Sequence, residues 1–114
     1  MILNIKLNEI QELATNGKAY AEGRQFFTDG YIREMIYDAA KKQYQARIYD
    51  PETGDAITTI TVNKQGRPIH ASCSCDDFKQ FVGCCSHLVA SMLLAESTEI
   101  NPGKKKNLSP PKSL

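Results

Sequence analysis

The most informative segment of this 114-residue chain reads Ala71-Ser-Cys-Ser-Cys-Asp-Asp-Phe-Lys-Gln-Phe-Val-Gly-Cys-Cys-Ser-His-Leu-Val-Ala90. Within 15 residues it holds Cys73, Cys75, Cys85 and His87, in the order Cys-x-Cys, nine residues, Cys-x-His. Thiolate and imidazole groups are ligands that suit zinc, and four of them complete a tetrahedral shell. The segment therefore predicts a structural zinc site with no open coordination position for a substrate.

The first ligand pair is expected at the end of a strand. If the backbone is extended from Ile69 to Cys75, side chains two residues apart lie on one face. Ile69 and Ala71 would then point toward the core, and Cys73 and Cys75 would continue the same line. His70 would lie on the opposite face, so we interpret it as a surface or partly buried histidine.

The second ligand pair is expected at the start of a helix. Apolar residues follow Cys85 at helical spacing, which places Cys85 and His87 at or just before the first helical turn. Free backbone N–H groups at that position favour a thiolate over a thiol. Gly83 lies where the returning loop must turn sharply, a position that suits a residue without a Cβ atom. The apolar residues are Leu88, Val89, Met92 and Leu93.

Alternatives to this ligand set stay open. The close cysteine pairs make strained disulfides, because Cys73 and Cys75 are two residues apart and Cys84 and Cys85 are adjacent. Longer-range pairings across the loop and free thiols remain as alternatives to zinc. Cys84 could also replace Cys85 as a ligand. We assign Cys84 to the loop, because the spacing from Cys85 to His87 mirrors that of the first pair.

This pattern resembles the SWIM zinc finger, whose signature is Cys-x-Cys, a loop of variable length and Cys-x-His, often followed by a small residue such as Ala90. Upstream, residues 18–32 resemble the helix and turn that precede the finger in many bacterial SWIM-containing proteins, including the N-terminal regions of bacterial Swi/Snf-type helicases. Asp76 and Asp77 stand where many members have proline, which makes this loop acidic. The resemblance implies zinc as the cofactor and nucleic acid or protein as the partner.

Two short helices are predicted before the first strand. Asn8 is the candidate cap of the first helix, and Asn16-Gly17 is expected to end it. The second helix is expected from Lys18 to Thr28, with Gly30 as its stop. Its aromatic residues are interpreted as core residues rather than platforms for stacking bases. They are Tyr20, Phe26 and Phe27.

After Gly30 the pattern changes from helical spacing to alternation. Four sequential strands with turn-like residues between them imply an antiparallel meander. One face of this sheet should pack against the N-terminal helices and the final helix, with the zinc knuckle at the end of the sheet. The fold class is therefore predicted to be α+β. The strands are expected at residues 31–38, 43–50, 56–63 and 67–73.

The charge distribution gives weak support to nucleic-acid binding. Residues 1–100 hold 10 basic and 13 acidic residues, although the whole chain holds 14 and 13. Duplex-binding domains usually carry a basic face, because contacts with phosphates supply much of their affinity. If DNA binds, the expected contacts are cations that flank the knuckle in sequence. They are Lys64, Arg67, Lys79, Lys104, Lys105 and Lys106.

The chain is expected to form one SWIM-type zinc-binding domain over residues 1–100, followed by a flexible basic linker or tail over residues 101–114. No stretch resembles a signal peptide or reaches the length of a membrane span. Reduced cysteines that bind metal fit a reducing compartment, so we expect the cytoplasm. No small-molecule substrate and no membrane are expected as partners.

Two classes of function, and a third minor one, follow from these residues. The preferred class is a zinc-stabilised recognition module that binds DNA or a protein partner, as an accessory domain of a helicase or chromatin-remodeller-like protein. The alternative is a protein-interaction or purely structural domain without a nucleic-acid role. The minor alternative is a thiol redox or metal sensor with Cys84 as the reactive thiol. We expect no enzyme, because the chain has no catalytic constellation and no phosphate-binding loop.

Overall fold

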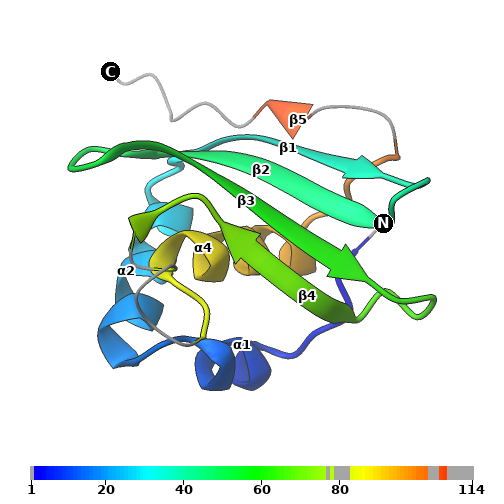
Figure 1. Cartoon of the computed structure of the whole chain (residues 1–114), viewed down its shortest axis with the longest axis horizontal. Helices are drawn as coiled ribbons and strands as arrows, with labels where there is room; N and C mark the ends of the chain where they lie inside the picture. The colour runs from blue at the N-terminus through cyan, green and yellow to red at the C-terminus, as the bar shows by residue number, and fades with distance from the viewer. Residues whose placement is uncertain (1, 77, 79–82, 103–105, 108–114) are drawn as a thin grey trace.

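An antiparallel sheet lies over three helices in the part of the chain that the computed structural model describes, which comprises residues 2–76, 78, 83–102 and 106–107 (Figure 1). This arrangement confirms the predicted α+β fold. The elements are α1 (Leu7–Leu13), α2 (Gly17–Thr28), β1 (Ile32–Asp38), β2 (Gln43–Asp50), β3 (Gly54–Val62), β4 (Pro68–Cys73), α4 (Ser86–Ser97) and β5 (Lys106–Asn107).

The two N-terminal helices begin at caps that differ from the prediction. The first helix, α1, begins directly after Lys6, whose backbone N–H donates to Glu9 Oε1 at 2.9 Å, so Asn8 lies inside the helix. Asn16 does not end α1 but caps α2, because its side-chain oxygen accepts from the backbone N–H of Ala19 at 2.8 Å. Asparagine suits both a helix start and the turn after a helix, so residue type alone favoured the wrong helix.

Helix α4 occupies the centre of the fold, directly under the sheet, while α1 and α2 pack mainly against α4 (Figure 1). The N-terminal helices therefore lie on the predicted side of the sheet but reach it through α4. Ser86–Ala95 is buried throughout, and a helix buried on all sides needs cover on both of its faces. Gly23 permits the contact between α2 and α4, because a Cβ atom there would meet Val89 Cβ at 2.5 Å.

The predicted four-stranded meander is confirmed, with the strands in the order β4, β3, β2 and β1. Along β2, buried residues alternate with more exposed ones, as expected for a sheet with one packed face. The buried apolar residues are Tyr44, Ala46 and Ile48, and they join the core between the sheet and α4. The aromatic residues of α2 also pack against this core, as predicted; they are Tyr20, Phe26 and Phe27.

A short fifth strand, β5, extends the sheet beyond β1. It pairs in antiparallel register, with Lys106 opposite Met35 and Asn107 opposite Glu34. No strand was expected in this segment, which is predicted as a flexible tail. Residues 103–105 and 108–114, which make up most of the predicted tail, lie outside the described residues.

The prediction for Ile69 is wrong, because its side chain is 63% exposed. The pairing of β3 with β4 shifts register at this point: His70 pairs with Thr61, but Pro68 pairs with Val62. An extra residue in one strand interrupts the alternation of side chains between the two faces of a sheet. Ile69 is that extra residue, and the sequence carried no clear signal for the irregularity. His70 is exposed, as expected.

Candidate metal centre

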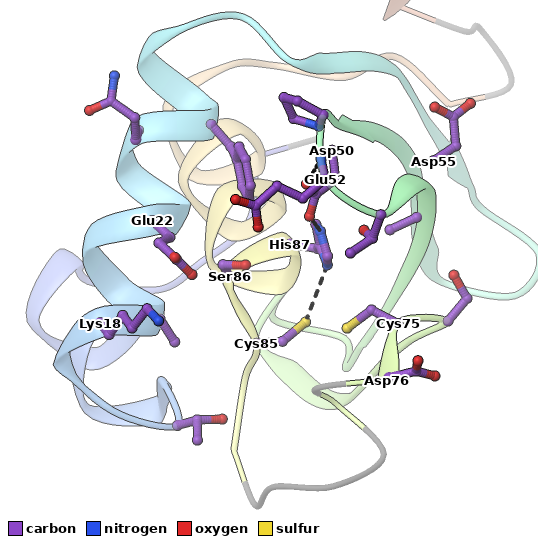
Figure 2. Close-up of a pocket in the computed structure, with 18 of the residues that line it drawn as sticks. Lys18, Glu22, Asp50, Glu52, Asp55, Cys75, Asp76, Cys85, Ser86 and His87 are labelled. Carbon is purple, nitrogen blue, oxygen red and sulfur yellow. Dashed lines mark hydrogen bonds and ion pairs between the residues drawn. The ribbon is translucent and has the colours of Figure 1, made fainter.

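The four predicted ligands come together where the end of β4 meets the start of α4. Figure 2 shows three of them, Cys75, Cys85 and His87. Cys73 is the last residue of β4, and Cys75 follows two residues later. Cys85 is the N-cap of α4, and His87 lies in the first turn of that helix, as predicted. Cys75 is half-buried and the other three side chains are buried, so the cluster is largely removed from water.

The spacing of the ligand atoms fits a tetrahedral zinc ion. All four atoms lie within 4.8 Å of one another. Nδ1 of His87 is 3.7 Å from Sγ of Cys73 and 3.9 Å from Sγ of Cys85. With bonds of about 2.3 Å to sulfur and about 2.0 Å to nitrogen, a tetrahedral zinc ion holds its ligand atoms roughly 3.5 to 3.8 Å apart. The residues present therefore suit zinc by donor chemistry, and their ligand atoms lie close to the separations that a bound ion requires.

Asp50, which the sequence analysis missed, fixes the orientation of the histidine ligand. Its Oδ2 lies 2.9 Å from Nε2 of His87 (Figure 2). Nδ1 is therefore the nitrogen that faces the thiols of Cys73 and Cys85. A carboxylate on the far nitrogen of a histidine ligand sets the tautomer and raises the basicity of the ligand. Asp50 ends β2, and its Oδ1 accepts from the backbone N–H of Glu52 at 2.9 Å. The turn between β2 and β3 therefore contributes to the centre.

Phe26 packs against the face of the His87 imidazole ring and limits its rotation. The rings of Phe26 and His87 are nearly parallel, with centroids 5.6 Å apart and an interplanar angle of 6°. Phe26 belongs to α2, so three elements position this one ligand: α4 carries it, β2 provides the carboxylate, and α2 covers its face. Ligands with locked orientation lose less freedom when a metal binds.

Hydrogen bonds among the thiols lower the pKa of one cysteine and raise that of its neighbour. The hydrogen bond from Cys73 is the largest cause that lowers the pKa of Cys85 to about 4, and it outweighs burial. The same bond, together with burial, raises the pKa of Cys73 well above its usual value. Burial raises the pKa of Cys75. The backbone N–H of Leu88 also lowers the pKa of Cys85, which agrees with the expected effect of the helix start.

The charge on Asp50 is maintained by its partners. Burial alone would raise the pKa of its carboxyl group, but hydrogen bonds from Glu52, His87 and Thr53 outweigh it and lower the pKa. Burial acts against the charged form of His87 as well, and hydrogen bonds with Cys85 and Asp50 reverse the effect and raise its pKa. The imidazole therefore lies between a carboxylate and the thiol group with the lowest pKa of the cluster.

The loop before α4 is anchored to the linker between α1 and α2. The backbone N–H of Cys84 donates to the carbonyl of Leu13 at 2.8 Å, and its carbonyl accepts from the N–H of Thr15 at 2.9 Å. Gly83 turns sharply with φ +103°, as predicted, and a Cβ atom there would meet Leu13 O at 2.9 Å. Glycine is therefore required at position 83 both for its conformation and for space.

Cys84 is a structural residue beside the ligand cluster. Its side chain is only 6% exposed, and it is not among the four grouped ligand atoms. Burial raises the pKa of its thiol to about 11. Reactive cysteines combine a lowered pKa with partial exposure, and Cys84 has neither property.

The three predicted nucleic-acid contacts that the structure describes are not gathered around the knuckle. Lys64 is exposed in the turn between β3 and β4, and Arg67 precedes β4, whereas Cys73 ends that strand. Arg67 is also engaged, with its Nη2 2.7 Å from Glu9 Oε2. Lys106 lies in β5, on the opposite edge of the sheet from β4. Lys79, Lys104 and Lys105 lie outside the described residues.

Residues 57–96 match the family model of the SWIM zinc finger. The matched region runs from β3 through β4 and all four ligands to the last turn of α4, and it leaves out residues 1–56. No curated protein and no solved structure matches the chain. The family match and the cluster of three cysteines and one histidine together support zinc as the metal of this centre. No helix within the described residues is long and apolar enough to cross a membrane.

Proposed function

We propose that this chain is a zinc-stabilised recognition module, in which the metal shapes a binding surface and takes no part in catalysis. The closed ligand set carries this proposal. Three thiols and one imidazole converge on one point, and zinc with four protein ligands keeps no position for a water molecule or a substrate. The ligands connect β4 with α4, so the binding energy of the metal contributes to the fold around them.

The partner that the charges favour is a protein. Exposed carboxylates surround the metal centre, from Glu22 on α2, Glu52 in the turn after β2, and Asp76 beside Cys75. A zinc ion with three thiolates and a neutral histidine adds a net charge of about −1 to this region. Phosphate groups would be repelled from such a surface, and a protein partner can present cations to it.

DNA is the second candidate partner. Lys64 is exposed and makes no ion pair with the described residues, so it is available to a phosphate. It lies at the end of β4 away from Cys73, so a DNA-binding surface would exclude the knuckle itself. The lysines at positions 79 and 104–106 would add to such a surface through their charge.

The wider context of the module is also a proposal. The resemblance of residues 18–32 to bacterial Swi/Snf-type helicases supports an accessory role in a helicase of the cytoplasm. The full open reading frame tests this proposal. ATPase motifs beyond Leu114 would support it, and a full reading frame without them would contradict it. The burial of Cys84 and its raised pKa argue against the redox-sensor alternative.

A salt titration separates the two partners. Labelled duplex DNA, single-stranded DNA and RNA would be titrated with the zinc-loaded chain between 50 and 200 mM salt, with anisotropy as the readout. For a protein-binding module we expect no nucleic-acid binding at the low-salt limit, where phosphate attraction is strongest. Binding that weakens steeply with salt would contradict the proposal. In that case Lys64→Ala should reduce the logarithmic slope by about one, and the control Lys41→Ala, in another turn, should not.

A further inference from the structure

A cavity of about 740 Å³ opens beside the metal centre (Figure 2). Its walls are one face of α2, the turn between β2 and β3, and the ligand segment around Cys75 and His87. The volume lies within the range of roughly 300 to 1,000 Å³ that is typical of ligand pockets. It is large enough for a few side chains of a partner, and the metal ligands form part of its wall.

One face of α2 is turned toward this cavity. Its lining residues recur three or four positions apart, which is the spacing of a single helix face. Lys18, Glu22 and Phe26 belong to this face, and Figure 2 shows Lys18 and Glu22 beside the opening. Another face of the helix, at Gly23, packs against Val89 of α4. Phe26 also stacks on His87 of α4, whereas Lys18 and Glu22 are exposed and remain available to a partner.

The lining has an excess of carboxylates. Asp50 and Asp55 also line the cavity, but Asp50 is bound to His87 and Asp55 to Arg47. Glu22, Glu52 and Asp76 remain exposed, and none of them has an ion pair with the described residues. Lys18 is the single cation among the lining residues that the structure describes.

The same cavity has apolar surface next to the carboxylates. Phe26 on α2 and Pro51 in the turn after β2 both line it. Lysine and arginine side chains combine an aliphatic stem with a charged end, so they match a lining that is apolar in one part and anionic in another. Arginine also stacks on aromatic rings.

We propose that this cavity binds an extended segment of a partner protein that carries lysine or arginine side chains. The proposal rests on the recognition function proposed above and specifies its partner. The stems of these side chains lie against Phe26 and Pro51, and their charged ends reach Glu22 and Glu52. The metal centre forms one wall, so its loss deforms the cavity.

The test uses the zinc-loaded full chain and a fluorescent eight-residue peptide that alternates arginine and serine. A matched peptide that alternates glutamine and serine serves as the neutral probe. The double variant Glu22→Gln with Glu52→Gln should bind the cationic peptide about fivefold to tenfold more weakly than the wild type. The control double variant, Glu12→Gln with Glu96→Gln, changes the net charge equally but lies away from the cavity. It should bind within about twofold of the wild type.

A variant that removes a positive charge from the cavity makes the opposite prediction. Lys18→Gln removes the single cation of the described lining, so it should tighten binding of the cationic peptide about twofold to fivefold. Lys41→Gln, in the turn between β1 and β2, gives the same change of net charge elsewhere and should have little effect.

Three results would overturn the proposal. The first is no binding of the cationic peptide at 50 mM salt. The second is equal weakening in the two double variants, since that would show general attraction to an acidic protein. The third is equal affinity for the cationic and neutral peptides. None of these results depends on the DNA titration, so the failure of this cavity can be distinguished from the failure of the recognition function.

Discussion

The two ends of the sheet differ in the side chains that they bury. At the metal end, defined by the turn between β2 and β3, Cys73 and the first half of α4, polar side chains are buried and bonded to one another. His87 contacts Asp50, and the hydroxyl groups of Thr58 and Ser91 lie 2.6 Å apart. At the far end, defined by the first half of β2, the last half of β3 and the N-terminal segment, the buried side chains are almost all apolar. They include Leu3, Tyr44, Ile60 and Val62.

The difference shows which end depends on metal. Buried thiols and an imidazole without a metal ion must share protons in a cluster removed from water, and that is unfavourable. The far end needs only hydrophobic burial, which works without any ligand. Ser86–Ala95 of α4 passes through both ends and connects them. We therefore expect a metal-dependent half and a metal-independent half around one shared helix.

Removal of zinc should have the largest effect. Structural zinc sites contribute binding free energies on the order of 10 kcal/mol, and that energy acts where the ligands lie. Hydrogen exchange with and without a chelator should show greater loss of protection in residues 69–94 than in α1, α2 and the first strands. Uniform loss along the chain would mean that the fold is a single metal-dependent unit. Unchanged protection would make the site dispensable.

Truncation of a buried side chain at the far end should have the next largest effect. Ile60 is 1% exposed in the core, so Ile60→Ala should lower the free energy of unfolding by about 2 to 5 kcal/mol. Because Ile60 supplies no ligand atom and pairs with Ala71 rather than with Cys73, the purified variant should still contain one zinc ion per chain. Chemical denaturation and elemental analysis measure the two quantities. Loss of zinc from this variant would show that the two ends are not separable.

Loss of the carboxylate behind His87 should weaken metal binding selectively. Asp50→Ala should reduce zinc affinity about tenfold to a hundredfold, measured by competition with a chromophoric chelator. Asp38 provides a matched control at the other turn, because its Oδ1 accepts from the backbone N–H of Ala40 at 3.0 Å, much as Asp50 accepts from Glu52. Asp38→Ala should leave zinc affinity unchanged. Equal effects of both substitutions on zinc affinity would show that Asp50 does not act through His87.

The hydroxyl group of Tyr44 should give the smallest effect. It is buried and has no hydrogen-bond partner among the described residues, so Tyr44→Phe should raise the free energy of unfolding by up to about 1 kcal/mol. Burial, with a smaller effect of Tyr37, raises the pKa of Tyr44 to about 12 from 10.0. In the unfolded chain this phenol ionises at a lower pH than in the folded chain. The wild type should therefore lose stability as the pH rises from 10.0 to about 12.

Thermal denaturation at neutral pH and between pH 10.0 and about 12 measures both effects. Above pH 10, Tyr44→Phe should lose less stability than the wild type, because it lacks the phenol whose ionisation favours the unfolded state. A Tyr44→Phe variant that is less stable than the wild type at neutral pH would mean that the hydroxyl group has a partner in solution.

The sequence predicted the features that depend on local spacing. The clustering of Cys73, Cys75, Cys85 and His87, the turn at Gly83 and the start of α4 all follow from residues within one short segment, where ligand spacing and helical period are directly readable. The meander followed from alternation and turn residues, because sequential strands with short connections pair with their neighbours.

The features that the sequence did not predict depend on distant contacts or on ambiguous residues. Asp50 is 37 positions from His87, and a lone aspartate at the end of a strand looks like an ordinary turn residue. The exposure of Ile69 depends on a register shift against β3. The pairing of β5 with β1 involves two residues in a lysine-rich segment, where composition favours an unstructured chain.

The most direct test of the account is the zinc content of the intact chain and of its cysteine variants, prepared without a chelator. We expect one zinc ion per chain by elemental analysis and native mass spectrometry, bound by Cys73, Cys75, Cys85 and His87. Cys84→Ser should retain that zinc, and Cys85→Ser should lose it. A folded wild type without zinc would contradict the account, and so would a Cys84→Ser variant that loses zinc while Cys85→Ser keeps it.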